Sequence, residues 1–156
     1  MNNLTNQSNN SKIISEDKAS PFLVTEFMTR GVLSFHKDET TQTAATKMMD
    51  LGVACFIVLD DNGISIGIVT EKDIVGKVVA KNLIPSEVTI ESIMSSPVKK
   101  LPTSTTIDEA IDEMNSHGIK HMVIYEALET GESVVGMLSF TNLVRADLSL
   151  NRLIIY

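Results

Sequence analysis

The sequence predicts an α+β fold of two repeats, each with the order strand, helix, strand, strand, helix. We expect the repeats to pack through their sheets as a pseudo-twofold pair. Residues 26–60 align with residues 92–126 at a constant offset of 66 and without a gap. In both copies, matching residues recur every four positions, which is the spacing of one face of a helix. Short apolar runs follow, and these predict strands.

The first helix of each repeat is marked by identical residues at its start, on its buried face and at its end. The four pairs are Thr40/Thr106, Ala44/Ala110, Met48/Met114 and Gly52/Gly118. The threonines suit the cap at a helix start, and the glycines suit the left-handed residue that ends a helix. In the second copy, "TIDE" also offers a capping box.

The strands follow each of these glycines as a short apolar run, a turn and a second strand. The first turn contains "DNG", a strong hairpin signal, and the second, "ALETGES", is three residues longer. The segments "GIVTEKDIV" (67–75) and "GMLSFTNLV" (136–144) then cross from a strand into the closing helix. A unit of about 55 residues rarely buries a sufficient core alone, so we expect the two units to pack together.

The domain organisation follows from this repeat and from a change in composition near the N-terminus. Residues 1–20 are rich in Asn, Ser and charge, which predicts a disordered leader. Residues 21–82 form the predicted first repeat. Residues 83–156 form the predicted second repeat, including a C-terminal helix.

The composition favours a cytoplasmic protein that does not bind nucleic acid. The net charge is −7 and the pI is near 4.9, whereas nucleic-acid binding rests on clustered Lys and Arg. Cys55 is the single cysteine, which excludes an internal disulfide and predicts a buried free thiol. The longest apolar run, residues 53–59, is far too short to cross a membrane, and the N-terminus has no signal pattern.

Thr70 and Asp73 in "GIVTEKDIV" allow two interpretations that do not exclude each other. Thr-x-x-Asp at a helix start is typical of a capping pair. A helix N-terminus is also an anion site, and a carboxylate can accept hydrogen bonds from both hydroxyls of a ribose. One junction could therefore serve as a cap and bind sugar and phosphate together.

The two repeats together resemble a tandem pair of cystathionine β-synthase (CBS) domains, a Bateman module. The resemblance rests on the leading segments "FMTRGVLSF" and "IMSSPVKKL", the Gly-apolar helix ends, and the closing motifs "GIVTEKD" and "GMLSFTN". It implies a regulatory module rather than an enzyme, with composite clefts between the repeats for AMP, ADP, ATP or S-adenosylmethionine. It also implies a homodimer formed through the helices, no covalently bound cofactor, and a separate protein partner.

The resemblance assigns residues to two clefts, each combining the closing motif of one repeat with the leading segment and post-helix strand of the other. The first cleft takes Thr70, Lys72, Asp73, Val98, Ile119, Lys120 and His121. The second takes Ser139, Thr141, Asn142, Val32, Val53, Ala54 and Cys55. The basic residues of the first cleft predict tighter nucleotide binding there, and Asn142 departs from the usual closing aspartate of the family.

Two other function classes stay open: a structural module with degenerate clefts that tethers an enzyme or transporter, and, less favoured, a nucleic-acid-binding module. No catalytic residues are expected, because the sequence has no P-loop, Gly-x-Ser-x-Gly or Cys–His pair. The three histidines, His36, His117 and His121, lack the spacing of a metal site, so no metal is expected. His117 suits the end of a helix, where a cation is favoured.

Overall fold

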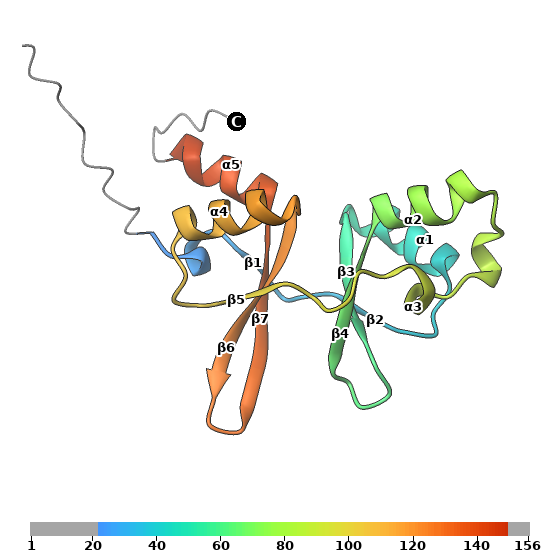
Figure 1. Ribbon diagram of the computed structural model, residues 1–156, viewed down its shortest axis with the longest axis horizontal. Helices are drawn as coiled ribbons and strands as arrows, with labels where there is room; N and C mark the ends of the chain where they lie inside the picture. Colours follow the sequence, from blue (N-terminus) through green and yellow to red (C-terminus); the bar gives the residue numbers. More distant parts are fainter. Residues whose placement is uncertain (1–21, 150–156) are drawn as a thin grey trace, which may run out of the picture.

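The computed structural model describes residues 22–149, with side chains through residue 146 (Figure 1). The predicted leader, 1–20, and the last residues of the predicted second repeat, 150–156, lie outside this range. No helix in the described part of the chain is long and apolar enough to cross a membrane.

The predicted order of elements is confirmed in both repeats. The first contains β1 (Thr29–Arg30), β2 (Ser34–His36), α1 (Thr41–Leu51), β3 (Cys55–Leu59), β4 (Ser65–Thr70) and α2 (Glu71–Lys77). The second contains α3 (Ile90–Ile93), β5 (Lys100–Pro102), α4 (Ile107–His117), β6 (His121–Leu128), β7 (Gly131–Ser139) and α5 (Phe140–Ser149). The strand β1, the short helix α3 and the 3-10 helices at Val24–Glu26, Val79–Lys81 and Pro85–Glu87 were not predicted.

The helix boundaries follow the predicted caps. The Thr40 hydroxyl accepts from the amide of Thr43 at 3.2 Å, and Gly52 ends α1 with a left-handed φ of 63°. Helix α4 has the predicted capping box at Thr106, and Gly118 ends it at φ 61°. His117 Nδ1 lies 2.9 Å from a carbonyl oxygen of the last turn of α4, which fits the predicted position at the helix end.

The strands form two sheets, with the orders β1-β7-β6-β5 and β2-β3-β4. Within each repeat, the antiparallel hairpin (β3–β4 or β6–β7) is joined by a short parallel strand. Helices α1, α2, α4 and α5 lie on one side of the molecule and the hairpin ends on the other (Figure 1). The β6–β7 hairpin is the longer one, in keeping with its longer predicted turn.

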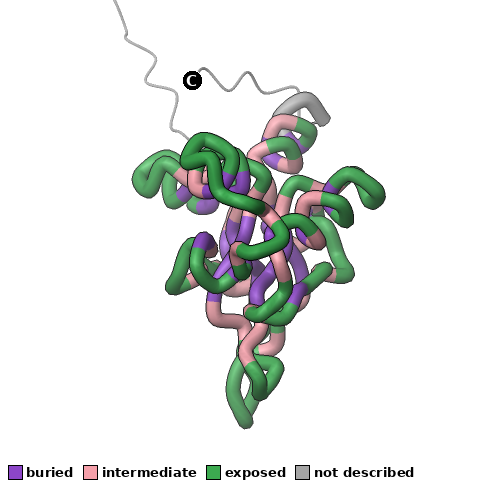
Figure 2. Tube along the Cα trace, turned by 90° about the vertical axis from the view of Figure 1, so that its right-hand side faces the viewer, coloured by how far each residue is buried: buried purple, intermediate pink, exposed green. Residues whose placement is uncertain are grey.

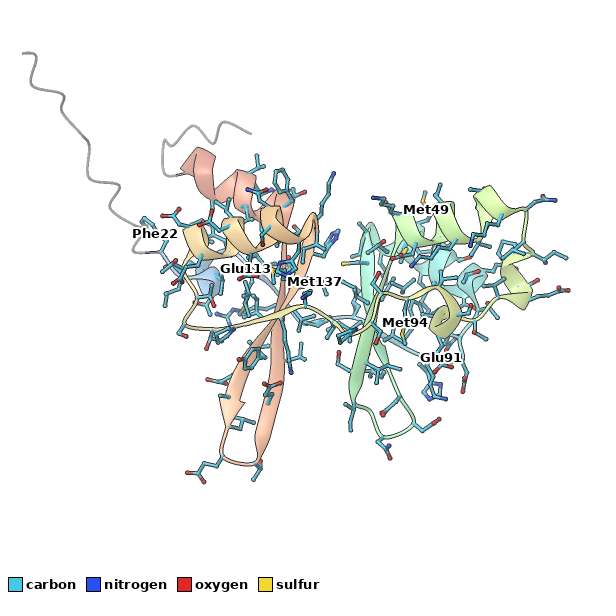
Figure 3. The ribbon with its side chains drawn as sticks, viewed as in Figure 1. Phe22, Met49, Glu91, Met94, Glu113 and Met137 are labelled. Carbon is cyan, nitrogen blue, oxygen red and sulfur yellow. The ribbon has the colours of Figure 1, made fainter. Side chains whose placement is uncertain are left out.

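The leading segments of the two repeats are exchanged between the cores. Val24 and Met28 are buried in the core of the second repeat, and β1 pairs with β7. Phe22, at the edge of this repeat in Figure 3, packs against the same core. In return, Ile90 and Ile93 are buried in the core of the first repeat. The repeat offset aligns these segments but does not reveal which core each one enters.

A third apolar cluster joins the two sheets, as the predicted packing requires. Its buried members are Ile57, Ile68, Val123 and Met137, contributed by β3, β4, β6 and β7. Burying one side chain of this size stabilises a fold by about 1.5–3 kcal/mol. Figure 2 shows that the buried residues gather along the strands, while the hairpin ends are exposed. Two cavities border this cluster.

Candidate functional site

A cavity of about 250 Å3 lies where the start of α5 faces the leading segment of the first repeat and the start of β3. It is lined by every residue predicted for the second cleft: Val32, Val53, Ala54, Cys55, Ser139, Thr141 and Asn142. The first and last of these residues, Val32 and Asn142, are more than 100 positions apart in the sequence. The fold therefore brings these seven residues of both repeats together around one cavity, and their role in binding a ligand stays a prediction.

Other residues of this cavity were not assigned to it from the sequence. Thr29, Gly31 and Leu33 lie next to Val32 in the leading segment. Their closeness to Val32 in the sequence could have identified them as lining residues. Met137 lies inside the closing motif "GMLSFTN", where it was interpreted only as apolar. Gly52 and His121 also line the cavity, although His121 was predicted for the first cleft.

Asn142 holds the junction between β7 and α5. Its side-chain oxygen accepts from the amide and the hydroxyl of Ser139, at 2.8 and 2.7 Å. The Ser139 hydroxyl in turn accepts from the backbone N–H of Asn142 at 3.2 Å. Because the side-chain oxygen of Asn142 is engaged in the cap, its side-chain NH2 group is the part that could contact a ligand.

Thr70 and Asp73 form the same cap at the first cleft, which confirms the predicted capping role. Asp73 Oδ2 accepts from the amide and the hydroxyl of Thr70, at 3.0 and 2.7 Å. Unlike Asn142, Asp73 is buried, and its Oδ1 lies 2.7 Å from Lys77 Nζ. Lys77 Nζ also donates to the carbonyl oxygen of Ile93. Both carboxylate oxygens are therefore engaged within the protein.

The second repeat has no such pairing at the equivalent position. The closing motifs align at an offset of 69, which places Gly136 on Gly67 and Ala146 on Lys77. Ala146 is fully buried and brings no charge to Asn142. The two junctions thus share the same cap. Only the Asp73 side chain has a lysine partner, because an alanine stands at the equivalent position near Asn142.

The remaining residues predicted for the first cleft are not gathered around the cavity described above, apart from His121. Lys72 and Lys120 are exposed, Val98 packs against the cluster between the sheets, and Ile119 packs against the core of the second repeat. The sequence prediction did not include Glu71, whose negative charge acts on His121. An acidic residue there offsets part of the positive charge expected of this cleft.

His121 is half-buried between the two repeats. Burial lowers the pKa of His121 below its ordinary value, Lys120 lowers it further, and Glu71 opposes both effects. The imidazole is therefore predominantly neutral at pH 7, and it offers the cavity a hydrogen-bonding ring rather than a fixed cation.

Cys55 contributes a wall of the cavity rather than a reactive group. Burial raises the pKa of its thiol to about 11, and the nearby Glu71 raises it as well. The sulfur lies 3.3 Å from the sulfur of Met137. A thiol with this pKa stays protonated at neutral pH, so it lacks the thiolate needed for nucleophilic chemistry.

One group of side chains with metal-ligand chemistry lies together within residues 22–146, namely His36, Asp38 and Asp61. Lys37 Nζ lies 3.2 Å from Asp61 and 3.6 Å from Asp38. The hydrogen bond to Asp61 raises the pKa of Lys37 and lowers the pKa of Asp61. Because an ammonium group already compensates these exposed carboxylates, we interpret the group as a surface ion-pair cluster.

The comparison with protein families decides what this architecture is. The model of the CBS domain matches residues 24–80 and 90–149, which is most of the chain. The chain belongs to the CBS-domain family. Its two CBS domains lie in tandem and form a Bateman module, as the sequence predicted.

Relatives of this Bateman module include archaeal proteins. A protein of Methanopyrus kandleri is 28% identical over 80% of this chain and 62% of its own length. A protein of Methanocaldococcus jannaschii is 32% identical over 69% of this chain and 57% of its own length. The chain thus spans about three fifths of these two curated relatives.

A solved structure adds a ligand. The CBS domain protein of Pyrobaculum aerophilum in complex with AMP is 25% identical to this chain. The similarity covers 83% of this chain and 97% of that one, with a TM-score of 0.70.

Proposed function

We propose that this Bateman module is a regulatory, non-enzymatic sensor that binds an adenine nucleotide in its second cleft. The observation that carries this proposal is the single cavity lined by the closing motif of one repeat and the leading segment and β3 of the other. The AMP complex of a relative with the same fold supports an adenosine ligand. Occupancy would pass to a protein partner or to the geometry of a dimer.

The lining of the cavity favours AMP over ADP, ATP or S-adenosylmethionine. Its volume of about 250 Å3 is close to the lower end of ligand pockets, which span about 300–1,000 Å3. The described residues that line it include no lysine or arginine to neutralise a triphosphate. The hydroxyl of Thr141 at the N-terminus of α5 suits a single phosphate group, which the helix dipole also favours.

The second cleft is the primary site in this proposal, although the charge pattern of the sequence ranked the first cleft higher. One observation favours the reversed order. The Asp73 carboxylate is buried and holds Lys77, whereas Asn142 lines an open cavity. The charge of Glu71 does not distinguish the clefts, because it acts on His121 and Cys55, which both line the second cavity.

Nucleotide binding should stabilise the folded chain in proportion to affinity. AMP at 100 times its dissociation constant is expected to add about 2.7 kcal/mol to the free energy of unfolding. Thermal unfolding with AMP, ADP, ATP and S-adenosylmethionine measures this, and AMP should give the largest shift at equal concentration. If no adenosine compound shifts the transition at millimolar concentration, the sensor proposal fails and a tethering module becomes the better account.

We further propose that two copies associate through the helices of the first repeat. Apolar side chains are exposed on α1 and around the end of α2, including Met49 at 79% exposure, Leu51, Val75 and Val79. Met49 lies on the helix side of the molecule, away from the hairpins (Figure 3). A surface of this kind is typical of a protein interface.

A charge on this helical surface should break the dimer. The double variant Met49→Glu/Val75→Glu is expected to sediment as a monomer under conditions where the unaltered chain sediments as a dimer. Leu128→Glu is the matched control, because Leu128 is an exposed apolar residue on the β6–β7 hairpin. An unchanged mass for the double variant, or a monomeric mass for the control, would contradict this interface.

A further inference from the structure

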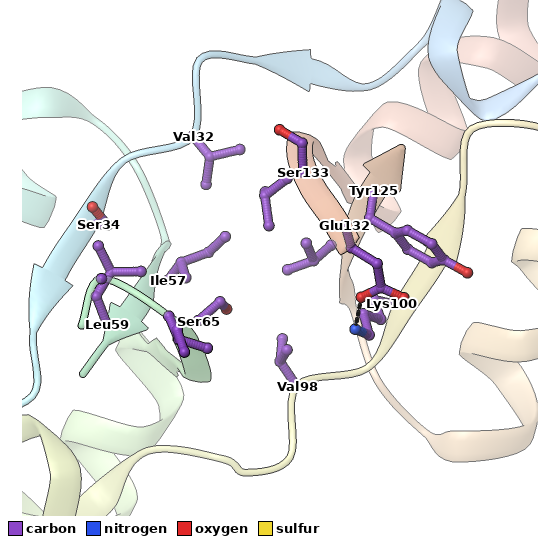
Figure 4. A pocket seen from close by; sticks show the side chains of 14 residues that line it. Val32, Ser34, Ile57, Leu59, Ser65, Val98, Lys100, Tyr125, Glu132 and Ser133 are labelled. Carbon is purple, nitrogen blue, oxygen red and sulfur yellow. Dashed lines mark hydrogen bonds and ion pairs between the residues drawn. The ribbon is translucent and has the colours of Figure 1, made fainter. Parts of the chain in front are cut away.

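A second and larger cavity, of about 480 Å3, lies between the two hairpins (Figure 4). Residues of the first repeat line one side and residues of the second repeat line the other. Apart from Val32, none of its lining residues borders the nucleotide cavity. Its volume falls within the usual range for small-molecule pockets.

The inner part of this cavity is apolar and symmetric. Val32 and Val98 are equivalent at the repeat offset, and so are Ile57 and Val123. All four residues pack in the cluster between the sheets. A branched or aromatic hydrocarbon group of a ligand would find a matching apolar surface on both sides.

Polar groups lie around this apolar surface. The Ser65 hydroxyl oxygen is shielded from solvent and has no hydrogen-bond partner among the described residues. An unpaired buried hydroxyl is unfavourable, and rotation of the Ser65 side chain toward the cavity would let a polar atom of a ligand satisfy it. Lys100 and Glu132 form an ion pair on the opposite wall, and Lys100 Nζ lies 5.3 Å from the centre of the Tyr125 ring.

The ion pair indicates the charge of the ligand. An anion bound to Lys100 alone would deprive Glu132 of its partner, and a cation bound to Glu132 alone would deprive Lys100. A ligand that carries both charges close together satisfies both side chains at once. We propose that this cavity binds an amino acid zwitterion with an apolar side chain, with its carboxylate on Lys100 and its ammonium on Glu132.

Calorimetric titration of the full chain with L-leucine and L-phenylalanine tests the proposal. We expect saturable binding of at least one of them, and at least tenfold weaker binding of matched analogues that lack one charge. For leucine these are 4-methylpentanoate, without the ammonium, and 3-methylbutylamine, without the carboxylate; for phenylalanine they are 3-phenylpropanoate and 2-phenylethylamine. An analogue that binds as tightly as its parent amino acid, or the absence of binding by both amino acids, would overturn the proposal.

Variants locate the site. Lys100→Met is expected to weaken amino acid binding about tenfold, the usual size of losing one charge-assisted hydrogen bond. Lys81→Met removes a lysine of the distant 3-10 helix Val79–Lys81 and should leave binding unchanged. Equal affinity of the Lys100→Met variant and the unaltered chain would overturn the assignment. These titrations contain no nucleotide, so their outcome is separate from that of the AMP experiment.

Discussion

Replacing Asn142 with alanine is expected to raise the dissociation constant for AMP about tenfold, whereas Asp73→Ala should change it less than threefold. Asn142 lines the nucleotide cavity, and its NH2 group is directed to ligand use because its oxygen is engaged by Ser139. Asp73 is buried and engaged by Thr70 and Lys77. Calorimetric titration of both variants with AMP measures the contrast.

The two variants control for each other at the helix start, because each removes the side-chain oxygen that accepts from the backbone amide and hydroxyl of the capping residue, Thr70 or Ser139. Losing these hydrogen bonds costs about 1 kcal/mol of stability in either case, and Asp73→Ala, the more disruptive change, also removes the partner of Lys77. A difference in AMP affinity therefore reports ligand contact rather than loss of helix structure. If Asp73→Ala weakens AMP more than Asn142→Ala, the first cleft is the primary site and the order suggested by the charge pattern holds.

Asn142→Asp extends this comparison by restoring the residue of the first motif. A carboxylate keeps one oxygen for the cap and presents a second, charged acceptor to the ligand. Adenosine, which has no phosphate for this charge to repel, should bind more tightly to the variant than to the unaltered chain. Weaker adenosine binding would mean that residue 142 does not contact the ribose.

The elements that the sequence predicts well are those specified by local chemistry. Thr40 and Gly52 mark the ends of α1 because a hydroxyl cap and a left-handed glycine act within one helical turn. The turn ending in Gly63 is similarly local. The exchange of the leading segments is different, because it depends on which core can accommodate Met28 and Ile90, and a repeat offset carries no information on that choice.

The composite cleft was predictable only through the repeat and its resemblance to CBS pairs. Seven residues from distant segments line one cavity as expected. The engagement of Asp73 by Lys77 follows helix geometry, since residues four apart share a face, and it could have been expected from "DIVGK". The burial of Asp73 could not have been expected from the sequence, because it depends on tertiary packing. The contribution of Glu71 near His121 also required the relative placement of the two repeats.

Gly136→Ala is expected to lower the free energy of unfolding by about 1–3 kcal/mol, the usual cost of overpacking. An added Cβ would lie 2.5 Å from Met28 Sδ and 3.0 Å from the carbonyl oxygen of Thr29. The thioether can move, but the carbonyl belongs to the β1–β7 pairing. Gly76→Ala is the matched control, since a Cβ there meets nothing within 4 Å, and in a helix it should stabilise by about 0.5–1 kcal/mol.

A substitution at Gly67 tests whether the contact of Gly136 with Met28 and Thr29 also shapes the nucleotide cavity. A Cβ at Gly67 would meet Met94 and Ser95, the equivalent residues of the other leading segment, at 2.6 and 3.0 Å. Gly67→Ala should therefore reduce stability about as much as Gly136→Ala. Only Gly136→Ala displaces Thr29, which lines the cavity proposed for AMP, so it alone should weaken AMP binding. Equal AMP affinity of the two variants in urea-free buffer would show that the path of the first leading segment does not determine the shape of the cavity.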